Sequence, residues 1–358
     1  MKKFLAMLLA AAMVMALAAC GSSDGQSSEA GTTPAATEGQ SADSTSTEAQ
    51  AEAWKPTKSV SAEIGYGAGG STDAALRPLF SVAEKEMGQT IVVNNVTGAS
   101  ASISFNAALQ QPADGYTLVI GAETPALYDA YDLIPETYDD TEIIMVVANT
   151  DNCIFVSKDS PYQTFTEMVE AEKANPGTVL KVASGKVGAS ANISAVIKAV
   201  AGVSFEEYTS DGSGTTVTSV MGGFADWGLA SFTSLKDYIA SGDVRVLCSA
   251  SSERVKEEYP CITEEYPDMA KYLPMNAFYA VTVKKGTDQA IIDYYTELFT
   301  KAYNSDTYQE TLANMGLNPL GLTGEEAAKF VHDYRLNAIT VLYETGAITH
   351  SPEELGLK

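Results

Sequence analysis

Apolar residues along most of the chain follow two alternating patterns, one typical of strands and the other of helices. Residues 59–64 alternate in polarity as a half-buried strand does, and Leu76, Phe80, Ala83 and Met87 then recur at helical spacing. A strand, a polar turn and a helix follow one another repeatedly from there on. Because strands that alternate with helices form sheets covered on both faces, the pattern predicts an α/β protein with mostly parallel strands.

The other predicted elements extend this pattern to the end of the chain. Further strands are expected at 91–93, 116–120, 143–147, 154–156, 180–183, 225–230, 244–247 and 278–283. Further helices are expected at 103–109, 165–173, 193–200, 235–240, 291–303, 308–315 and after Leu322. Thr323 and Glu326 have the spacing of a capping box for the last helix.

The N-terminus has a different pattern. Lys2 and Lys3 precede an uncharged apolar run over 4–19, which is shorter than the roughly 20 residues of a membrane-spanning helix. It predicts a signal peptide at 1–19. Leu17-Ala-Ala-Cys20 resembles a bacterial lipobox, whose Cys is acylated with fatty-acid chains such as palmitate, so Cys20 is the expected lipid anchor. The alternative is an ordinary signal peptide followed by an incidental Cys.

Residues 20–53 are expected to be a disordered acidic tether, since 21–53 are almost all Ser, Thr, Gly, Ala, Gln, Glu and Asp. The remaining 54–358 are long for one core and fit two lobes. Without Lys2, Lys3 and the six acids of 21–53, the formal net charge changes from −24 to −20. This charge argues against nucleic acid as a partner.

Cysteine and histidine usage suggests neither a metal nor a cofactor. Beyond Cys20 the chain has Cys153, Cys248 and Cys261, with no CxxC pair, and its two histidines do not cluster with them. Cys248 and Cys261 are close enough in sequence for a disulfide, and three buried thiols are the alternative.

Two turns are rich in glycine and hydroxyl residues. The first, 65–73, has four glycines in six residues, so the backbone can approach a ligand closely. The helix that follows offers unpaired N–H groups and a partial positive charge, and together these features predict an anion site without Lys or Arg. The second turn, 184–192, has the same character.

Two alternatives to an anion site fit the same turns. Gly65, Gly67 and Gly70 also match the dinucleotide pattern G-x-G-x-x-G, but Asn94 or Asn95 stands where an acid for the ribose is expected. A nucleotide-binding enzyme is therefore one alternative. The second is that each turn is an ordinary strand-to-helix connection, with Asp73 capping the first helix.

Several segments together resemble the extracytoplasmic receptors of tripartite tricarboxylate transporters, the TctC or Bug family. Residues 64–77 resemble its opening motif V-P-F-A-A-G-G-G-T-D-x-x-A-R, 88–95 resemble G-Q-x-V-V-V-E-N, and 112–118 resemble P-x-D-G-Y-T-L. Residues 183–190 are similar to A-S-x-G-x-G-S, and 222–226 to G-G-x-V-D. The resemblance covers nearly all of 55–345.

The resemblance implies an α/β, two-lobed periplasmic-binding-protein-like (type II) fold with a hinge and an interlobe ligand cleft. Lobe 1 would be 54–152 plus 276–358, and lobe 2 would be 153–275. By position in the family's motifs, the expected ligand-binding residues are Tyr66, Ala68, Gly69, Ser71, Thr72, Asp73, Ser184, Gly188, Ala189, Ser190, Asn192, Asp211 and Asp226.

Departures from the family pattern bear on the ligand. The family's R-P-G-A-G-G segment lacks its basic residue in 96–101, Asp211 stands where a Lys is common, and Asn192 replaces a His. Losing two cations and gaining an acid favours a monocarboxylate, or an amino acid whose ammonium needs an acceptor.

The resemblance implies a receptor and no enzyme. It would capture a small carboxylate, such as a di- or tricarboxylate, an amino acid or a related organic acid, and deliver it to integral-membrane transporter subunits. The expected protein is a monomer, anchored in the bilayer through Cys20 on the extracytoplasmic face of the cell membrane. The alternative is a ligand sensor for a membrane signalling kinase. An enzyme is disfavoured because 54–358, the expected folded part, has no G-x-S-x-G elbow, and His332 and His350 lie far from both turns in sequence.

Overall fold

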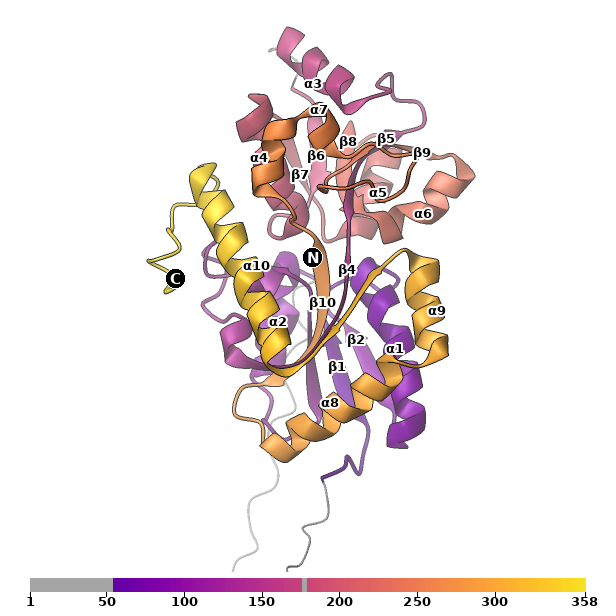
Figure 1. Ribbon diagram of the computed structural model, residues 1–358, viewed down its shortest axis with the longest axis vertical. Coiled ribbons are helices and arrows are strands. Elements are labelled where there is room, and N and C mark those ends of the chain that lie inside the picture. The colour runs from indigo at the N-terminus through magenta and orange to yellow at the C-terminus, as the bar shows by residue number, and fades with distance from the viewer. Residues whose placement is uncertain (1–53, 176–178) are drawn as a thin grey trace, which may run out of the picture. The chain divides into compact units, whose positions relative to one another are not determined.

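The structure of the protein is a computed structural model that describes residues 54–175 and 179–358. The predictions for 1–53, including the signal peptide and Cys20, lie outside the described residues. The described residues belong to one compact unit that contains two β-sheets (Figure 1). Among the helices described, none is long and apolar enough to cross a membrane.

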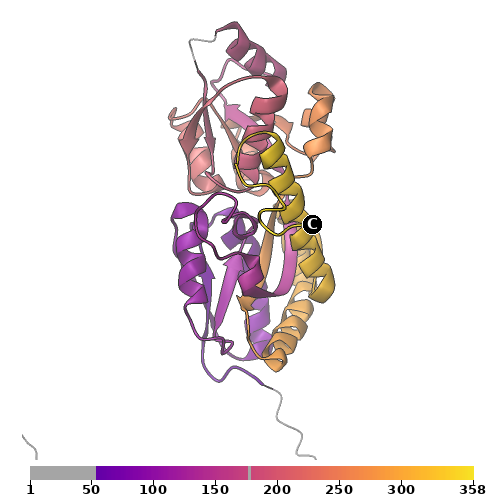
Figure 2. The same cartoon turned by 90° about the vertical axis from the view of Figure 1, so that its left-hand side faces the viewer.

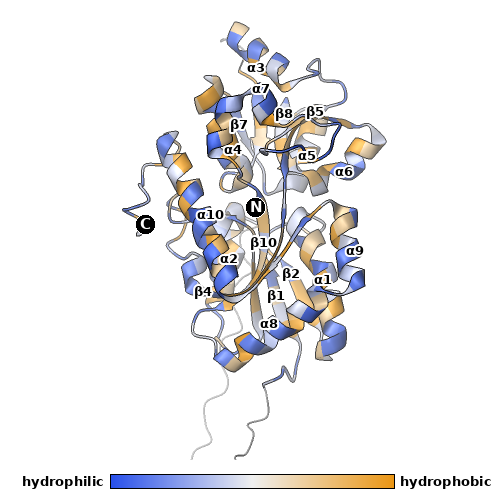
Figure 3. Ribbon diagram, in the orientation of Figure 1, coloured by the Kyte–Doolittle hydropathy of each residue, from blue (hydrophilic) through white to orange (hydrophobic). Residues whose placement is uncertain are grey.

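The first sheet has six strands in the order β11-β4-β10-β3-β1-β2. They are β1 (Val60–Ile64), β2 (Ile91–Asn95), β3 (Thr117–Gly121), β4 (Thr141–Thr150), β10 (Ala277–Lys284) and β11 (Asn318–Leu322). One face packs against α1 (Ser71–Met87), α8 (Gln289–Tyr303) and α9 (Asp306–Met315), and the other against α2 (Ser102–Leu109) and α10 (Gly324–Glu344). Because both faces are covered, the two central strands, β3 and β10, are buried and apolar along most of their length, whereas β1 nearer the edge alternates between apolar and polar residues (Figure 3).

The second sheet has five strands in the order β7-β6-β8-β5-β9. They are β5 (Asn152–Ser157), β6 (Lys181–Ser184), β7 (Glu206–Thr209), β8 (Trp227–Ser231) and β9 (Val244–Ser249). Helices α3 (Phe165–Ala174), α4 (Ala189–Ala201) and α7 (Ile262–Glu265) cover one face, while α5 (Ser213–Met221) and α6 (Phe232–Ser241) cover the other. The two-lobed α/β fold predicted from the sequence is confirmed.

The prediction of mostly parallel strands is wrong in part. β1 pairs in parallel with β2 and β3, and β6 with β7 and β8. β10 is antiparallel to β3 and β4, β11 is antiparallel to β4, and β5 is antiparallel to β8 and β9. The reason is topological: the strands at which the chain enters and leaves the second sheet run against their neighbours, and a buried apolar run does not encode its direction.

The chain passes between the sheets twice. Asp151 alone separates β4 from β5, and the return path leads through Asn276 into β10. The two crossings are joined, since Asn276 Nδ2 donates to Asp151 Oδ1 at 3.0 Å. Helix α10 also spans the junction (Figure 2), with Val341 in the core of the second sheet and Ile339 in that of the first. The lobe boundaries expected from the resemblance remain a prediction.

Three local features differ from the sequence prediction or settle an alternative. The helix α5 and the strands β7 and β11 were not predicted. The capping box is wrong: Thr323 is the N-cap of α10 but accepts no side-chain bond, because Gly324 has a φ of +54° and the first turn is irregular. Cys153, Cys248 and Cys261 are buried and free, so Cys248 and Cys261 form no disulfide.

Candidate ligand-binding cleft

A cavity of about 350 Å³ lies between the two sheets, at the carboxyl ends of their parallel strands. The turns after β1, β2 and β3 line it from one side, and those after β6 and β7 from the other. Asn152, Ala277 and Tyr279, from the two crossings, complete the lining. Open α/β sheets bind their ligands at this edge, because the helix N-termini converge there.

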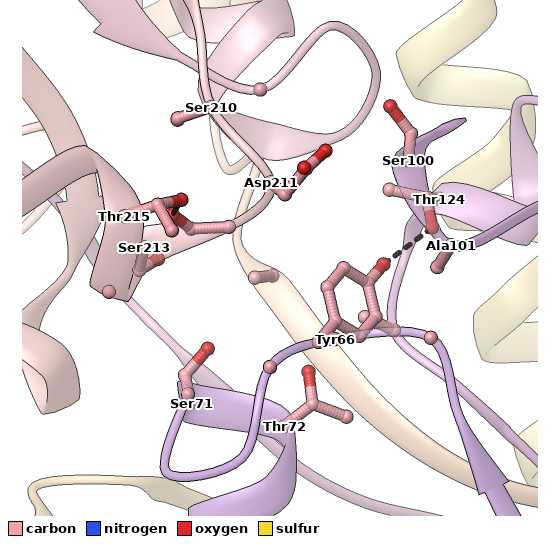
Figure 4. A pocket seen from close by; sticks show the side chains of 18 of the residues that line it. Tyr66, Ser71, Thr72, Ser100, Ala101, Thr124, Ser210, Asp211, Ser213 and Thr215 are labelled. Atoms are coloured by element: carbon pink, nitrogen blue, oxygen red, sulfur yellow. Dashed lines mark hydrogen bonds between the residues drawn. The ribbon is translucent and has the colours of Figure 1, made fainter. Parts of the chain in front are cut away.

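The first wall is the glycine-rich turn before α1. Ser71 and Thr72 begin the helix and line the cavity (Figure 4). No side chain caps this N-terminus, so the first N–H groups of α1 are available to an anion.

Asp73 lies beneath this turn and outside the cavity lining. Its carboxylate accepts from Gly69 N at 2.9 Å, from Arg77 Nη2 at 2.5 Å and from Asn95 Nδ2 at 3.1 Å. Burial acts to raise the pKa of Asp73, but these hydrogen bonds outweigh it and the pKa is lowered. Asp73 therefore holds the turn in shape as a carboxylate.

The facing wall is the turn between β7 and α5. Ser210, Asp211, Ser213 and Thr215 line the cavity, and Figure 4 shows the Asp211 side chain reaching across it toward Ser100 and Thr124. Ser210 Oγ is fixed by the Ser184 carbonyl at 3.1 Å and by Thr216 Oγ1 at 2.6 Å. Helix α5 has no side-chain cap, so its N-terminus also presents free N–H groups.

A left-handed segment after β2 forms one side of the cavity. Ala99, Ser100 and Ala101 have φ values of 46°, 54° and 71°, a conformation that costs non-glycine residues roughly 1–2 kcal/mol each. The Ser100 carbonyl accepts from Tyr128 Oη at 2.8 Å, and Tyr128 in turn contacts Thr124. The strain is thus concentrated at the cavity and supported by neighbouring side chains.

Glu123, directly after β3, is the second acid in the lining. It is 7% exposed, and its Oε1 accepts from Ala189 N, at the start of α4, at 2.8 Å. Burial raises the pKa of Glu123, although the bond from Ala189 opposes the shift. A side chain of the first lobe therefore caps a helix of the second.

The lining contains two acids and, among the residues that the structure describes, no Arg, Lys or His. Two buried donors in it have no hydrogen-bond partner, Asn152 Nδ2 and Tyr279 Oη. Tyr279 Oη lies near the hydroxyls of Ser71 and Thr150, but without the geometry of a hydrogen bond. Buried polar groups without a partner are unusual in folded proteins, so these two donors mark a place for a ligand acceptor or a water molecule. The described residues include no cluster of His, Cys, Asp and Glu suited to a metal ion.

The structure brings about half of the predicted site residues to the cavity. Those that line it are Tyr66, Ala68, Gly69, Ser71, Thr72, Ser190 and Asp211. The remaining residues, which lie outside its lining, are Asp73, Ser184, Gly188, Ala189, Asn192 and Asp226.

Each residue outside the lining has a contact that explains its place. Ser184 Oγ donates to Glu207 at 2.9 Å, and Asn192 is fully buried beside Tyr131. Asp226 precedes β8 at the far end of the sheet, where its carboxylate accepts from Lys181 N at 2.7 Å. Trp227, which follows it, is buried against Phe205.

Glu123, Asn152, Tyr279 and the turn 212–215 were missed by the sequence prediction. The turn could have been found, because Gly212-Ser-Gly-Thr-Thr216 repeats the glycine and hydroxyl character of the other two turns. Glu123 had no such signal, since its partner Ala189 lies 66 residues away in sequence.

Comparisons with known proteins give a consistent result. The family model for the tripartite tricarboxylate transporter family receptor matches residues 76–346. A UPF0065 protein of Cupriavidus necator, from the gbd 5′ region, is 28% identical over 314 residues, which cover 86% of this chain and 91% of the relative.

Two solved structures share the fold. Rpa4515 of R. palustris, solved with adipate, has a TM-score of 0.76 at 20% identity over 82% of this chain and 98% of its own. MatC of Rhodopseudomonas palustris, solved with bound malate, has a TM-score of 0.72 at 18% identity over 80% of this chain and 99% of its own.

Proposed function

The chain belongs to the receptor family of tripartite tricarboxylate transporters, and we propose that it captures one small carboxylate in the cavity between its lobes. Members of this family are extracytoplasmic solute-binding receptors and not enzymes. The observation that carries the proposal is the pair of uncapped helix N-termini, α1 and α5, that meet at the cavity from opposite lobes. Adipate and malate in two proteins of the same fold are consistent with a carboxylate ligand.

The mechanism follows from this arrangement. A carboxylate held by N–H groups and hydroxyls of both lobes binds the closed state more tightly than an open one, and so shifts the population toward closure. The closed receptor, a monomer anchored through Cys20, then delivers the ligand to the membrane subunits of the transporter. Loss of membrane association on Cys20→Ser tests the anchor.

A thermal-unfolding screen of the purified full chain tests the function. The panel holds mono-, di- and tricarboxylates, amino acids and nucleotides. A ligand at 100 times its Kd adds about 2.7 kcal/mol to the free energy of unfolding. We expect a dose-dependent rise in Tm with carboxylates, abolished by Ser71→Trp, which fills the cavity at the start of α1.

Ser81→Trp is the matched control, because Ser81 is an exposed serine ten residues further along the same helix. It should leave the rise in Tm unchanged. A rise in Tm with nucleotides, and none with any carboxylate, would contradict the proposal.

A further inference from the structure

The carboxylate of Glu123 occupies the anion position at the start of α4. Gly188, the N-cap of that helix, supplies no side-chain bond, and the first turn of α4 has no acid of its own. The Glu123 carboxylate provides both the acceptor and the negative charge, through its bond to Ala189 N.

Glu123 lies too close to the start of α4 for a second anion to bind there. A Cβ on Gly188 would lie 2.5 Å from Glu123 Oε1 and 2.8 Å from Thr124 Cγ2. Resemblance alone suggested that this turn would hold a ligand carboxylate. In this chain the position is already filled, so the second lobe offers a ligand carboxylate the start of α5 instead.

The two carboxylates of the cavity are gathered near Thr124: Glu123 is its neighbour in sequence, and Asp211, although it directly precedes α5, directs its side chain toward Thr124 (Figure 4). The starts of α1 and α5, with the unpartnered Asn152 Nδ2 and Tyr279 Oη, present donors. Glu123 and Asp211 present carboxylates, and no basic side chain among the described lining residues neutralises them. A second ligand carboxylate near them would be repelled strongly, because like charges in a partly buried site are poorly screened.

We propose that Glu123 determines the specificity of the cavity: the ligand carries one carboxylate, and its opposite end is an ammonium or another hydrogen-bond donor, not a second carboxylate. This inference rests on the proposed function and names the ligand class of the same site. The ligand carboxylate binds between α1 and α5, and its donor end faces Glu123 and Asp211.

Isothermal titration calorimetry on the full chain, with two series matched in carbon number, tests this proposal. The probes are butyrate, 4-aminobutyrate and succinate, then hexanoate, 6-aminohexanoate and adipate. Each series changes the far end from methyl to ammonium to carboxylate. The proteins are the wild type, Glu123→Gln, Glu123→Asp and the control Glu172→Gln.

Glu172 is a close structural match for Glu123 outside the cavity. It is 6% exposed and accepts from Leu180 N at 3.0 Å, whereas Glu123 is 7% exposed and accepts from Ala189 N at 2.8 Å. An effect that any buried, backbone-bonded carboxylate would have when it is lost will appear in both Glu123→Gln and Glu172→Gln. A change in ligand preference should appear only in Glu123→Gln.

In the wild type we expect the amino acid of at least one series to bind more tightly than the dicarboxylate. Glu123→Gln should lower the ratio of amino-acid to dicarboxylate affinity ten- to hundredfold, the range for a hydrogen bond between charged groups. Glu123→Asp keeps the charge and should keep the wild-type order, as should Glu172→Gln.

Dicarboxylate preference in the wild type, with the ratio unchanged in Glu123→Gln, would overturn the inference and leave the carboxylate receptor intact. Equal changes in Glu123→Gln and Glu172→Gln would also overturn it. If the wild type bound no member of either series and no carboxylate of the thermal screen, the proposed function itself would fail.

Discussion

The turns at 65–73 and 184–192 are alike in sequence but play different parts in the cleft. Both follow a parallel strand, both are rich in glycine and hydroxyl residues, and both lead into a helix without a local side-chain cap. The first holds its acid, Asp73, underneath and leaves the start of α1 open to the cavity. The second has no acid and receives Glu123 from the other lobe.

The two turns show that glycine and hydroxyl content does not decide whether a helix N-terminus is open to a ligand. The deciding factor is whether a carboxylate of the protein itself already occupies that N-terminus. Asp73 is held to its own turn by Gly69 and Arg77 and cannot reach past it. Glu123 extends from a different sheet and fills the start of α4. In the second lobe, the turn before α5 therefore offers the open helix N-terminus, although residues of the turn at 184–192 also line the cavity.

The largest expected effect is at the second turn. Gly188 has a φ of +102°, and a Cβ there would meet Glu123 and Thr124. Gly188→Ala should therefore lower the free energy of unfolding by about 4 kcal/mol, combining backbone strain and overpacking. Urea unfolding measures it.

Gly67→Ala is the counterpart in the first turn. A Cβ on Gly67 would meet nothing within 4 Å, and its φ is not left-handed, so its cost should stay within about 0.5 kcal/mol. Similar costs for the two variants would show that the turns are not packed differently.

The first turn was predictable because its determinants are local. β1, the glycines, Asp73 and α1 follow one another within thirty residues, and the alternation of β1 and the helical spacing of α1 are both clear in the sequence. The second cleft wall was harder to predict. β7 is exposed at every position and has no hydrophobic pattern, and α5 has only a short apolar stripe, Val217, Val220 and Met221, after a polar start.

The remaining features of the site depend on contacts between residues that are far apart in the sequence. Glu123 caps a helix of the other lobe, and Asn152 and Tyr279 reach the cavity because the two crossings lie side by side. Strand direction also depends on how distant segments pair, as the antiparallel pairing of β10 with β3 shows. None of these contacts has a local signature in the sequence.

The acids of the two turns should respond to pH in opposite directions. Asp73 has a lowered pKa in the folded state, so it contributes stability above its unfolded pKa of about 3.9, and this is lost as the pH falls through its folded value. Glu123 has a raised pKa, so its contribution is largest below its unfolded pKa of about 4.3 and is lost as the pH rises through its folded value.

Asp73→Asn should cost about 2 kcal/mol at neutral pH and progressively less in acid, since a buried charged acceptor is lost. Glu123→Gln should instead gain stability relative to the wild type as the pH rises above about 4.3. Chemical unfolding between pH 3 and 8 measures both differences. Slopes of the same sign would contradict the opposite roles assigned to the two acids.

The smallest expected effect concerns the left-handed segment that lies against the first turn. Ser100 has a φ of +54° and lines the cavity. Ser100→Gly relieves roughly 1–2 kcal/mol of strain but makes the unfolded chain more flexible by about 0.4–1 kcal/mol. The net gain in the free energy of unfolding should be about 0.5 kcal/mol, seen as a small rise in Tm.

Ala68→Gly in the turn itself provides the control. Ala68 is exposed and does not have a positive φ, so its replacement increases only the flexibility of the unfolded chain and should cost about 0.4–1 kcal/mol. Opposite signs for the two glycine substitutions would place the backbone strain in the segment after β2. If both destabilised the protein equally, that segment would hold no strain, and the shape of the cavity would have to come from the turn before α1 alone.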